Sequence, residues 1–309
     1  MQAAQLREPD SARGKPERAQ MKIGIFAAFV SPIATPELLS EFGRRCEEAG
    51  VESIWMGEHV VLFDRMEFPY PGSKDGRVPV PHGGGILDMV STFGFLAAAT
   101  KRMRLGSGIC LVPQRNPVYT AKEFATLDWL SGGRIDFGVG VGWCKEEVIS
   151  SGYGWEDRGK RCDEFLELIR TLWTAQVATF HGQFASVTEC QMDPKPVQKP
   201  HIPIIVGGHT AAAMRRASRF GAGWYGFGLN VQAARAALKH LDPALADAGR
   251  KRGAGFEIIV TPPYEITPDM AVAYREMGVD RLVVQLGRQR LHDIEARLNT
   301  IQELAGVAA

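Results

Sequence analysis

Hydrophobic positions along the chain follow two alternating patterns. Short apolar runs, typical of buried strands, are separated by amphipathic stretches in which apolar residues recur every three or four positions. The runs predict eight strands: residues 22–27, 53–57, 103–108, 134–139, 202–206, 223–227, 256–261 and 281–286. The helical spacing is clearest in three sets: Leu39, Phe42, Cys46 and Ala49; Cys162, Phe165, Ile169 and Trp173; Leu291, Ile294, Leu298 and Ile301.

The eightfold alternation of strand and helix predicts an α/β fold. Strands that are apolar on both faces suit a parallel sheet covered by helices. Eight of them favour a closed (β/α)8 TIM barrel over an open doubly wound sheet. Thr35 followed by Pro36 predicts the start of the first helix, and Gly50 predicts its end.

Two segments interrupt the alternation and are predicted insertions after strands 2 and 4. Residues 60–86 are rich in proline and contain a run of three glycines. They follow the carboxyl end of a strand, which is the face where barrels build active sites. Residues 175–201 contain a candidate hairpin turn at His181-Gly182, and they suit a lid or substrate wall and a surface insertion equally well.

Charge and composition exclude several classes of protein. The 309 residues carry 36 Lys and Arg against 35 Asp and Glu, so the net charge of +1 gives no field that attracts nucleic acid or an anionic membrane. No apolar run approaches the roughly 20 residues of a membrane-spanning helix. Five cysteines without a CxxC pair predict reduced thiols in a cytoplasmic enzyme.

The first twenty residues differ in composition from the rest. Residues 1–20 mix both signs of charge with Pro and Gly and lack an apolar region, which predicts a disordered N-terminal tail rather than a signal peptide. A true start at Met21 is an equal alternative. Residues 21–306 are then predicted to form one barrel domain.

The candidate functional segments are glycine-rich, and familiar catalytic motifs are missing from the sequence. The motifs of serine hydrolases, zinc proteases, P-loop proteins and EF-hands are absent, and the seven His residues lack ligand spacing, so no metal site is predicted. Glycine clusters end three predicted strands, at 106–108, 138–142 and 207–208. A tight strand exit explains any one of them, whereas three at one mouth favour a cradle for a flat ring or a phosphate.

Glu58 and His59 end the second predicted strand. A His at this place can give a proton or hydrogen bond to a bound ring, with Glu58 fixing its tautomer or placing a charge nearby; a strand-end His beside solvent is the alternative. Glu146 and Glu147 either reach the mouth or begin a solvated helix. Cys110 and Cys144 lie near the same face, but no adjacent His marks either as a nucleophile.

Five longer strings carry a resemblance to a known family. They are EFGRRCEEAGVESIWMGEHV (41–60), RLGSGICLVPQRNP (104–117), LDWLSGGRIDFGVGVGW (127–143), PHIPIIVGG (200–208) and ASRFGAGW (217–224). The chain resembles the bacterial luciferase-like monooxygenase superfamily and, within it, the oxidoreductases that use the deazaflavin coenzyme F420. The resemblance runs from Met21 to about Gly306.

The resemblance implies a luciferase-like barrel with a ring bound at its carboxyl mouth and a non-prolyl cis peptide at Gly108–Ile109. It implies that His59 faces the reactive centre of the ring and that Glu58 stands where deazaflavin members often carry Asp. The implied cofactor-binding residues are Ser107, Gly108 and Ile109 at the ring, Val141 and Gly142 beside the ring and its ribityl chain, and Gly207 and Gly208 at the phosphate. Trp143 departs from members that carry an acidic residue there, which puts their acid–base step in doubt.

The implied cofactor is F420, with FMN as the alternative. FMN luciferases hold the phosphate with an Arg where this chain has Val141, and that charge-assisted contact is lost here. Candidate contacts for the acidic tail of F420 are Arg115, Arg158, Arg161 and Lys195. The expected activity is hydride transfer between F420 and a small organic substrate, in a homodimer, with a flavin or F420 reductase supplying electrons. The alternatives are an FMN monooxygenase that inserts one oxygen atom from O2 and a carrier without activity.

Overall fold

The computed structural model describes residues 20–70, 76–78, 80, 83–263, 265–286 and 291–308. Apart from Gln20, the predicted tail lies outside these residues. Eight strands coincide with the predicted ones to within one or two residues: β1 (Lys22–Phe26), β2 (Ser53–Met56), β3 (Arg104–Ser107), β5 (Ile135–Gly140), β8 (Ile204–Gly207), β9 (Gly223–Phe227), β10 (Glu257–Thr261) and β11 (Arg281–Gln285).

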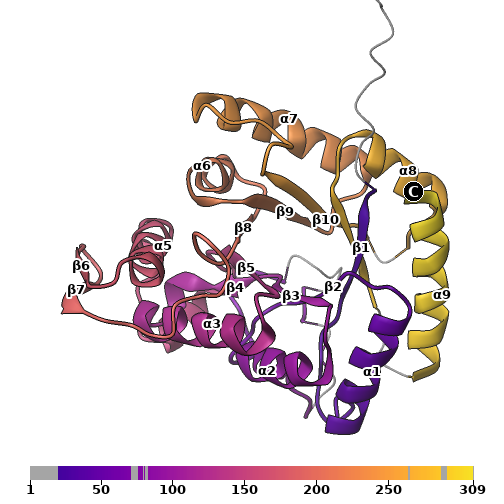
Figure 1. Ribbon diagram of the computed structural model, residues 1–309, viewed down its shortest axis with the longest axis horizontal. Coiled ribbons are helices and arrows are strands. Elements are labelled where there is room, and N and C mark those ends of the chain that lie inside the picture. The colour runs from indigo at the N-terminus through magenta and orange to yellow at the C-terminus, as the bar shows by residue number, and fades with distance from the viewer. Residues whose placement is uncertain are drawn as a thin grey trace, which may run out of the picture.

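These eight strands form a closed parallel barrel. Each strand pairs with the next in chain order, β3 pairs with β5, and β1 pairs with β11 to complete the ring. Helices surround the barrel in chain order (Figure 1): α1 (Pro36–Glu48), α2 (Met89–Ala99), α3 (Pro117–Ser131), α4 (Lys145–Ser150), α5 (Arg158–Thr174), α6 (Ala211–Phe220), α7 (Val231–Asp247), α8 (Pro268–Glu276) and α9 (Leu291–Ala308). The predicted (β/α)8 fold is confirmed.

Helix boundaries follow from local chemistry. The Thr35 hydroxyl accepts a hydrogen bond from the Leu38 N–H at 3.2 Å, and Pro36 begins α1. Gly50 follows the helix with φ 78°, a conformation that favours glycine. The predicted helix faces point inward. Their buried members are Leu39, Phe42, Cys46, Cys162, Phe165, Ile169, Trp173, Ile294, Leu298 and Ile301.

The inside of the barrel has its own apolar core. The rings of Trp55 and Tyr225 stack with centroids 5.2 Å apart, and both side chains are fully enclosed. Gly106 is required there because a Cβ at this position would lie 2.5 Å from the Trp55 ring. Ile205, Ile259 and Val283 complete this inner core, and the half-buried side chains of Phe26, Ile109 and Phe227 cover its carboxyl end.

The opposite, amino-terminal end of the barrel contains a buried ionic cluster, formed by Glu52, Arg104, Asp136, Glu257 and Arg281. Arg281 Nη1 lies 2.7 Å from Asp136 Oδ2, and Arg104 Nη2 lies 2.5 Å from Asp136 Oδ1. Burial raises the pKa of Asp136, but Arg281 and Arg104 outweigh it and hold the pKa below its usual value. Glu257 and Glu52 lie 3.0 and 3.2 Å from Arg281.

The two insertions lie in different places. The described part of the first insertion, residues 60–86, ends beside the segment that follows β1. There Val30 forms a β-bridge with Ile86, and the Ser31 N–H donates to the Gly85 carbonyl at 2.9 Å. The second contains the antiparallel hairpin of β6 (Ala178–His181) and β7 (Ser186–Cys190). Figure 1 shows it at the outer edge of the molecule beside α5, so its interpretation as a surface insertion is favoured over a substrate wall. Among the described residues, none of the helices has the length and hydropathy to cross a membrane.

Candidate functional site at the carboxyl end of the barrel

The carboxyl end of the barrel brings together a histidine and a buried carboxylate. His59 follows β2, and its Nδ1 lies 3.0 Å from Glu147 Oε2 in α4. The other oxygen of Glu147 accepts the Val60 N–H at 2.6 Å, and the Glu147 side chain is only 1% exposed. A carboxylate on Nδ1 favours the tautomer that carries the proton there. Nε2 has no hydrogen-bond partner within the described part of the chain and is left to act on a ligand.

Glu147 therefore replaces Glu58 as the partner that fixes the tautomer of His59. Glu58 is also buried, but its oxygens point elsewhere: Oε2 accepts the Leu111 N–H at 2.7 Å, and Oε1 pairs with Arg115. Burial raises the pKa of Glu58, Arg115 and the Leu111 N–H oppose that rise, and the nearby Glu147 adds to it. The prediction that Glu58 holds the His59 tautomer is wrong, and the side chain instead braces the segment after β3.

That segment starts with the cis peptide bond between Gly108 and Ile109, as the resemblance implied. The Ile109 side chain crosses the mouth and fills the space above two glycines. A Cβ on Gly140 would lie 1.9 Å from Ile109 Cδ1, and one on Gly207 would lie 2.8 Å from Ile109 Cγ2. Gly140 and Gly207, which were predicted to cradle a ligand, therefore make space for the Ile109 side chain.

Two other predicted cofactor contacts have partners within the protein. The Ser107 hydroxyl donates to the Gly138 carbonyl at 2.8 Å and is buried, so it is not free to donate to a ring. The Gly208 N–H is directed to the Tyr225 carbonyl at 3.4 Å, a weak contact. Val141 and Gly142 are half-buried just beyond β5, where Gly142 adopts φ 76°. These two remain in place to line the mouth.

Aromatic side chains from two different segments enclose His59. The ring of Trp143 lies 5.7 Å from the imidazole and 5.3 Å from the ring of Tyr70. Tyr70 itself lies 6.5 Å from the imidazole. Tyr70 belongs to the proline-rich insertion, and nothing in the spacing of that segment could have singled it out.

The cysteines near the mouth are poor nucleophiles. Burial raises the pKa of Cys110 well above its usual value, and the charge of Glu58 adds to the effect. Burial also raises the pKa of Cys144, with the charges of Glu147 and Glu146 contributing. Neutral thiols at both positions agree with the prediction that neither performs covalent catalysis.

Most of the cations suggested for an acidic tail are engaged within the protein. Arg115 pairs with Glu58 and Glu123. Arg161 is buried and donates to the Pro113 and Gly154 carbonyls, and Lys195 donates to the Leu172 carbonyl. Arg158 lies 3.5 Å above the Trp155 ring at the start of α5, and its Nη1 donates to the Trp155 carbonyl at 3.1 Å, while its buried Nε has no hydrogen-bond partner among the described residues.

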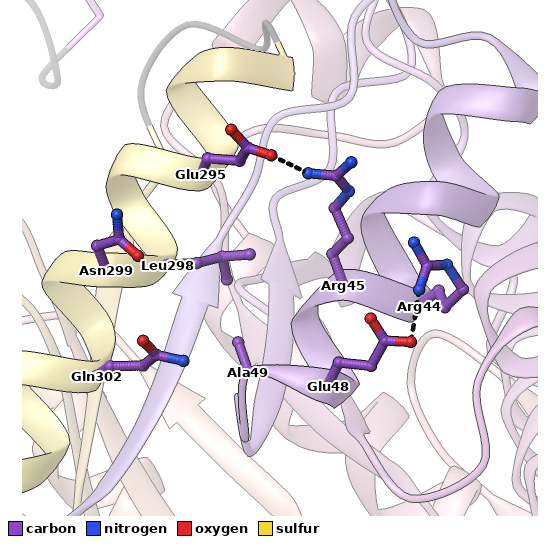
Figure 2. A pocket seen from close by; sticks show the side chains of 8 residues that line it. All are labelled: Arg44, Arg45, Glu48, Ala49, Glu295, Leu298, Asn299 and Gln302. Atoms are coloured by element: carbon purple, nitrogen blue, oxygen red, sulfur yellow. Dashed lines mark hydrogen bonds and ion pairs between the residues drawn. The ribbon is translucent and has the colours of Figure 1, made fainter.

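Two surface hollows lie between outer helices, and the second includes His209 and Ala211, next to Gly208. One, of about 500 Å³, separates α1 from α9 and is bordered by the Arg45–Glu295 ion pair at 2.5 Å (Figure 2). The other, of about 590 Å³, lies between α6 and α7 beside His240. Neither hollow is lined by His59, Glu147 or Ile109.

Comparison with known proteins identifies the family. Residues 21–307 match the model of the family described as luciferase-like monooxygenase. The chain belongs to the luciferase-like monooxygenase family. The relatives include a named monooxygenase and a named dehydrogenase, so the protein is an enzyme of the oxidoreductase class.

Three relatives illustrate the range of the luciferase-like family. The uncharacterized protein Rv0953c of Mycobacterium tuberculosis is 31% identical over 254 residues, which are 82% of this chain and 88% of that protein. The F420-dependent glucose-6-phosphate dehydrogenase of Amycolatopsis mediterranei is 30% identical and covers 61% of this chain and 53% of its own. The FMNH2-dependent dimethylsulfone monooxygenase of Pseudomonas putida is 33% identical and covers 50% and 43%.

Solved structures agree on the fold. Monooxygenase RslO1 from Streptomyces bottropensis superposes with a TM-score of 0.73 at 21% identity, covering 93% of this chain and 98% of its own. An F420-dependent secondary alcohol dehydrogenase superposes with the same TM-score at 17% identity, covering 92% and 99%. At these identities the likeness concerns the barrel alone.

The residues at the mouth fit a flat flavin-type ring. Phe26, Ile109 and Phe227 form an apolar floor over the inner core, and the half-buried Gly57 lies beside it, where a Cβ would be 3.7 Å from the Phe26 ring. A ring needs an apolar surface, close backbone and a polar group at its reactive face. The floor, the glycine backbone and His59 provide these three features.

Proposed function

We propose that this protein is an F420-dependent oxidoreductase that transfers a hydride between a deazaflavin at the barrel mouth and a small organic substrate. The observation that carries the proposal is the His59 imidazole, held by Glu147 above an apolar floor with Nε2 unpartnered among the described residues. Hydride transfer to or from an oxygen-bearing carbon requires that a proton move on or off that oxygen, and an oriented imidazole serves this purpose.

In this proposal the bound deazaflavin supplies the carbon that gives or accepts the hydride. His59 accepts a hydroxyl proton at Nε2 when the substrate is oxidised and returns it to a carbonyl in the reverse direction. Glu147 holds Nδ1–H and stabilises the imidazolium that forms, so it orients the base without meeting the substrate. Glu58 contributes a second buried negative charge, paired with Arg115.

The proposed cofactor contacts run from the ring, through the ribityl chain, to the phosphate. Gly108 and Ile109 would lie beneath the ring, and Val141 and Gly142 beside the ring and its ribityl chain. The phosphate would lie near Gly207 and Gly208, close to the amino terminus of α6, where the helix dipole favours an anion. Ser107 would contribute through its backbone, because its hydroxyl is already engaged.

Two features favour F420 over FMN. Val141 stands where an arginine would grip the terminal phosphate of FMN, and a phosphate that continues into a longer tail needs that grip less. The F420-dependent relative also covers a larger share of this chain than the FMNH2-dependent one, 61% against 50%.

The second candidate is an FMN-dependent two-component monooxygenase that inserts one oxygen atom from O2, which the similarity to the dimethylsulfone monooxygenase favours. Oxygen consumption separates the two activities. A carrier that binds the ring without turnover is the remaining alternative, and an inactive holoprotein against a broad substrate panel would identify it.

The proposed partners are a second copy of the chain and a flavin or F420 reductase. Large apolar side chains remain exposed on the neighbouring helices α2 and α3, with Leu130 70% exposed and Tyr119, Trp129 and Phe95 beside it in the same pair of helices. A homodimer would cover them. Light scattering on the wild type and on Leu130→Glu tests this, and a wild-type monomer would contradict it.

Parallel titrations of the purified protein with F420 and FMN, each oxidised and reduced and followed by fluorescence, test the proposed function. Tight binding of F420 with weak binding of FMN supports the deazaflavin activity. The opposite preference favours the monooxygenase, and binding of neither cofactor overturns the site at the mouth.

A further inference from the structure

We propose that the mouth selects an uncharged hydroxy or carbonyl compound with an aromatic or aliphatic body, whose oxygen meets Nε2 of His59 while its body packs against the contiguous rings of Tyr70 and Trp143. The inference rests on the proposed function, because it names the substrate class of the same site. It concerns the side of the mouth formed by the first insertion and α4.

Two aromatic rings adjoin the imidazole. The ring centroids of Trp143 and Tyr70 lie 5.7 and 6.5 Å from that of His59, with interplanar angles of 70° and 76°, and the two rings also contact each other. Rings arranged in this way bury large apolar area with little loss of conformational freedom and prefer flat or aliphatic carbon groups. A substrate that brings its oxygen to Nε2 must place its neighbouring carbons against these rings.

Tyr70 reaches inward over the barrel rather than outward. Its ring is half-buried and lies 6.5 Å from the His59 imidazole and 5.3 Å from the Trp143 ring. Both of these neighbours follow the carboxyl ends of barrel strands. The first insertion thus supplies a wall of the substrate site.

Apolar residues continue from His59 along the same segment. Val60, Val61 and Leu62 are exposed, Val60 by 63%, although a soluble surface usually scatters such residues singly. Further along, Phe68 stacks on Trp155 with ring centroids 5.8 Å apart. The segment that follows the proposed base is therefore an apolar rim, defined by Val60, Val61 and Leu62, and its exposure leaves it ready to contact a substrate body.

Charged groups on this side are already compensated. Glu147 serves His59 and the Val60 N–H, and Lys145 pairs with Glu67 at 2.6 Å. Asp64 and Arg65 adjoin one another in the chain, so their opposite charges give the segment no net field. A phosphorylated substrate needs strong charge-assisted donors, and desolvating it against aromatic rings without them is unfavourable.

The chemical balance of the step is simple. In oxidation the substrate O–H bond breaks and its proton goes to Nε2 of His59, while the hydride of the adjacent C–H bond leaves for the cofactor and a C=O bond forms. In reduction each of these transfers is reversed. The cofactor is the only redox partner that the step needs.

The test uses the F420-loaded protein. We measure kcat/KM from the change in F420 absorbance for 1-phenylethanol and cyclohexanol, for acetophenone and cyclohexanone with reduced F420, and for glucose 6-phosphate. Calorimetric titration of acetophenone gives binding without turnover. We expect at least about a hundredfold preference for the uncharged compounds, in line with what a few well-placed contacts discriminate.

Variants localise the preference. Trp143→Ala and Tyr70→Ala should each raise KM about tenfold for the uncharged compounds, while F420 affinity stays unchanged and Trp143→Phe retains most of the binding. Ile149→Ala is the matched control, because Ile149 is exposed on the same short helix as Glu147.

Preference for glucose 6-phosphate, lack of binding and turnover of every uncharged compound, or unchanged KM in both variants would overturn the inference while F420 still binds. Failure to bind F420 would instead overturn the proposed function.

Discussion

The two ends of the barrel use buried charge in opposite ways. At the amino-terminal end, Arg281 is 2% exposed and lies within 3.2 Å of three carboxylates, so its charge is compensated within the protein. At the carboxyl end, Glu147 holds one nitrogen of His59 and leaves the other without a partner among the described residues. Charges that are paired within the protein serve the fold, whereas a nitrogen without a partner can act on a ligand, in keeping with the division of labour between the two faces of such barrels.

Each end also buries an arginine–carboxylate pair, and the two pairs differ in electrostatic strength. Two arginines lower the pKa of Asp136 in spite of its burial. Burial raises the pKa of Glu58 in spite of Arg115. The charged form is therefore less favoured for Glu58 at the mouth than for Asp136 at the amino-terminal end. This difference suits a site where a cofactor brings charges of its own.

The largest effect is expected at His59. His59→Ala should lower turnover about 10²- to 10⁴-fold, the usual contribution of a general acid–base group. F420 affinity should stay nearly unchanged, and stability should fall by at most about 1–3 kcal/mol, because the buried Glu147 loses one of its two hydrogen-bond partners. Steady-state kinetics with calorimetric cofactor titration check this, and unchanged turnover would remove His59 from the mechanism.

Asp136→Asn, at the amino-terminal end, should lower stability and leave turnover nearly unchanged. Removing one partner of a buried ion pair destabilises a protein by about 3–5 kcal/mol, because Arg281 loses a main counter-charge. Urea unfolding should show this loss, while turnover per folded molecule stays close to wild type. A variant that is as stable as the wild type would contradict the stabilising role of the ionic cluster.

The same residue predicts an acid dependence. The folded-state pKa of Asp136 is depressed below the unfolded value of about 3.9. Near pH 4 the unfolded chain therefore binds more protons, so the stability that Asp136 contributes is present above that pH and is lost as pH falls through the folded pKa. Asp136→Asn should lack this part of the acid slope, which urea titrations between pH 7 and 3 measure.

The barrel could be predicted from the sequence because its signals are local. Apolar runs such as 223–227 and caps such as Thr35 depend on neighbouring residues, and the structure has both in the predicted places. Partnerships at the mouth depend on residues that are far apart in the chain. His59 and Glu147 are 88 positions apart, so spacing could not choose between Glu147 at the mouth and Glu147 in a solvated helix.

The glycine clusters show the same limit. Their position at strand ends was predicted, but their reason lies in bulky side chains elsewhere, with Trp55 against Gly106 and Ile109 against Gly140 and Gly207. Ser107 was likewise expected to donate to a ring, and its hydroxyl donates to Gly138 instead. A glycine motif indicates that a side chain would not fit at that position, but it does not indicate whether a ligand or another protein side chain occupies the space.

Glu147→Gln should have a smaller effect than His59→Ala. The amide has one acceptor oxygen where the carboxylate serves both His59 Nδ1–H and the Val60 N–H, so one of these donors is left unsatisfied. An unsatisfied buried donor costs about 1–3 kcal/mol. We expect turnover to fall by about one to two decades with a shifted pH–rate profile, whereas Glu146→Gln, on the same helix, should behave as wild type because the amide oxygen can still accept the Glu67 N–H. An unshifted profile would make Glu147 merely structural.

Gly140→Ala should have the smallest effect and asks whether this glycine serves the cofactor or the protein. The new Cβ would lie 1.9 Å from Ile109 Cδ1, and overpacking of this kind costs about 1–3 kcal/mol. Ile109→Val removes that terminal methyl, so the double variant should be more stable than the sum of the single effects predicts, as measured by a double-mutant cycle in urea. F420 affinity should recover together with stability. Recovery of stability without recovery of affinity would mean that Gly140 is needed by the ring itself, and the carboxyl end would then be shaped around its ligand rather than around Ile109.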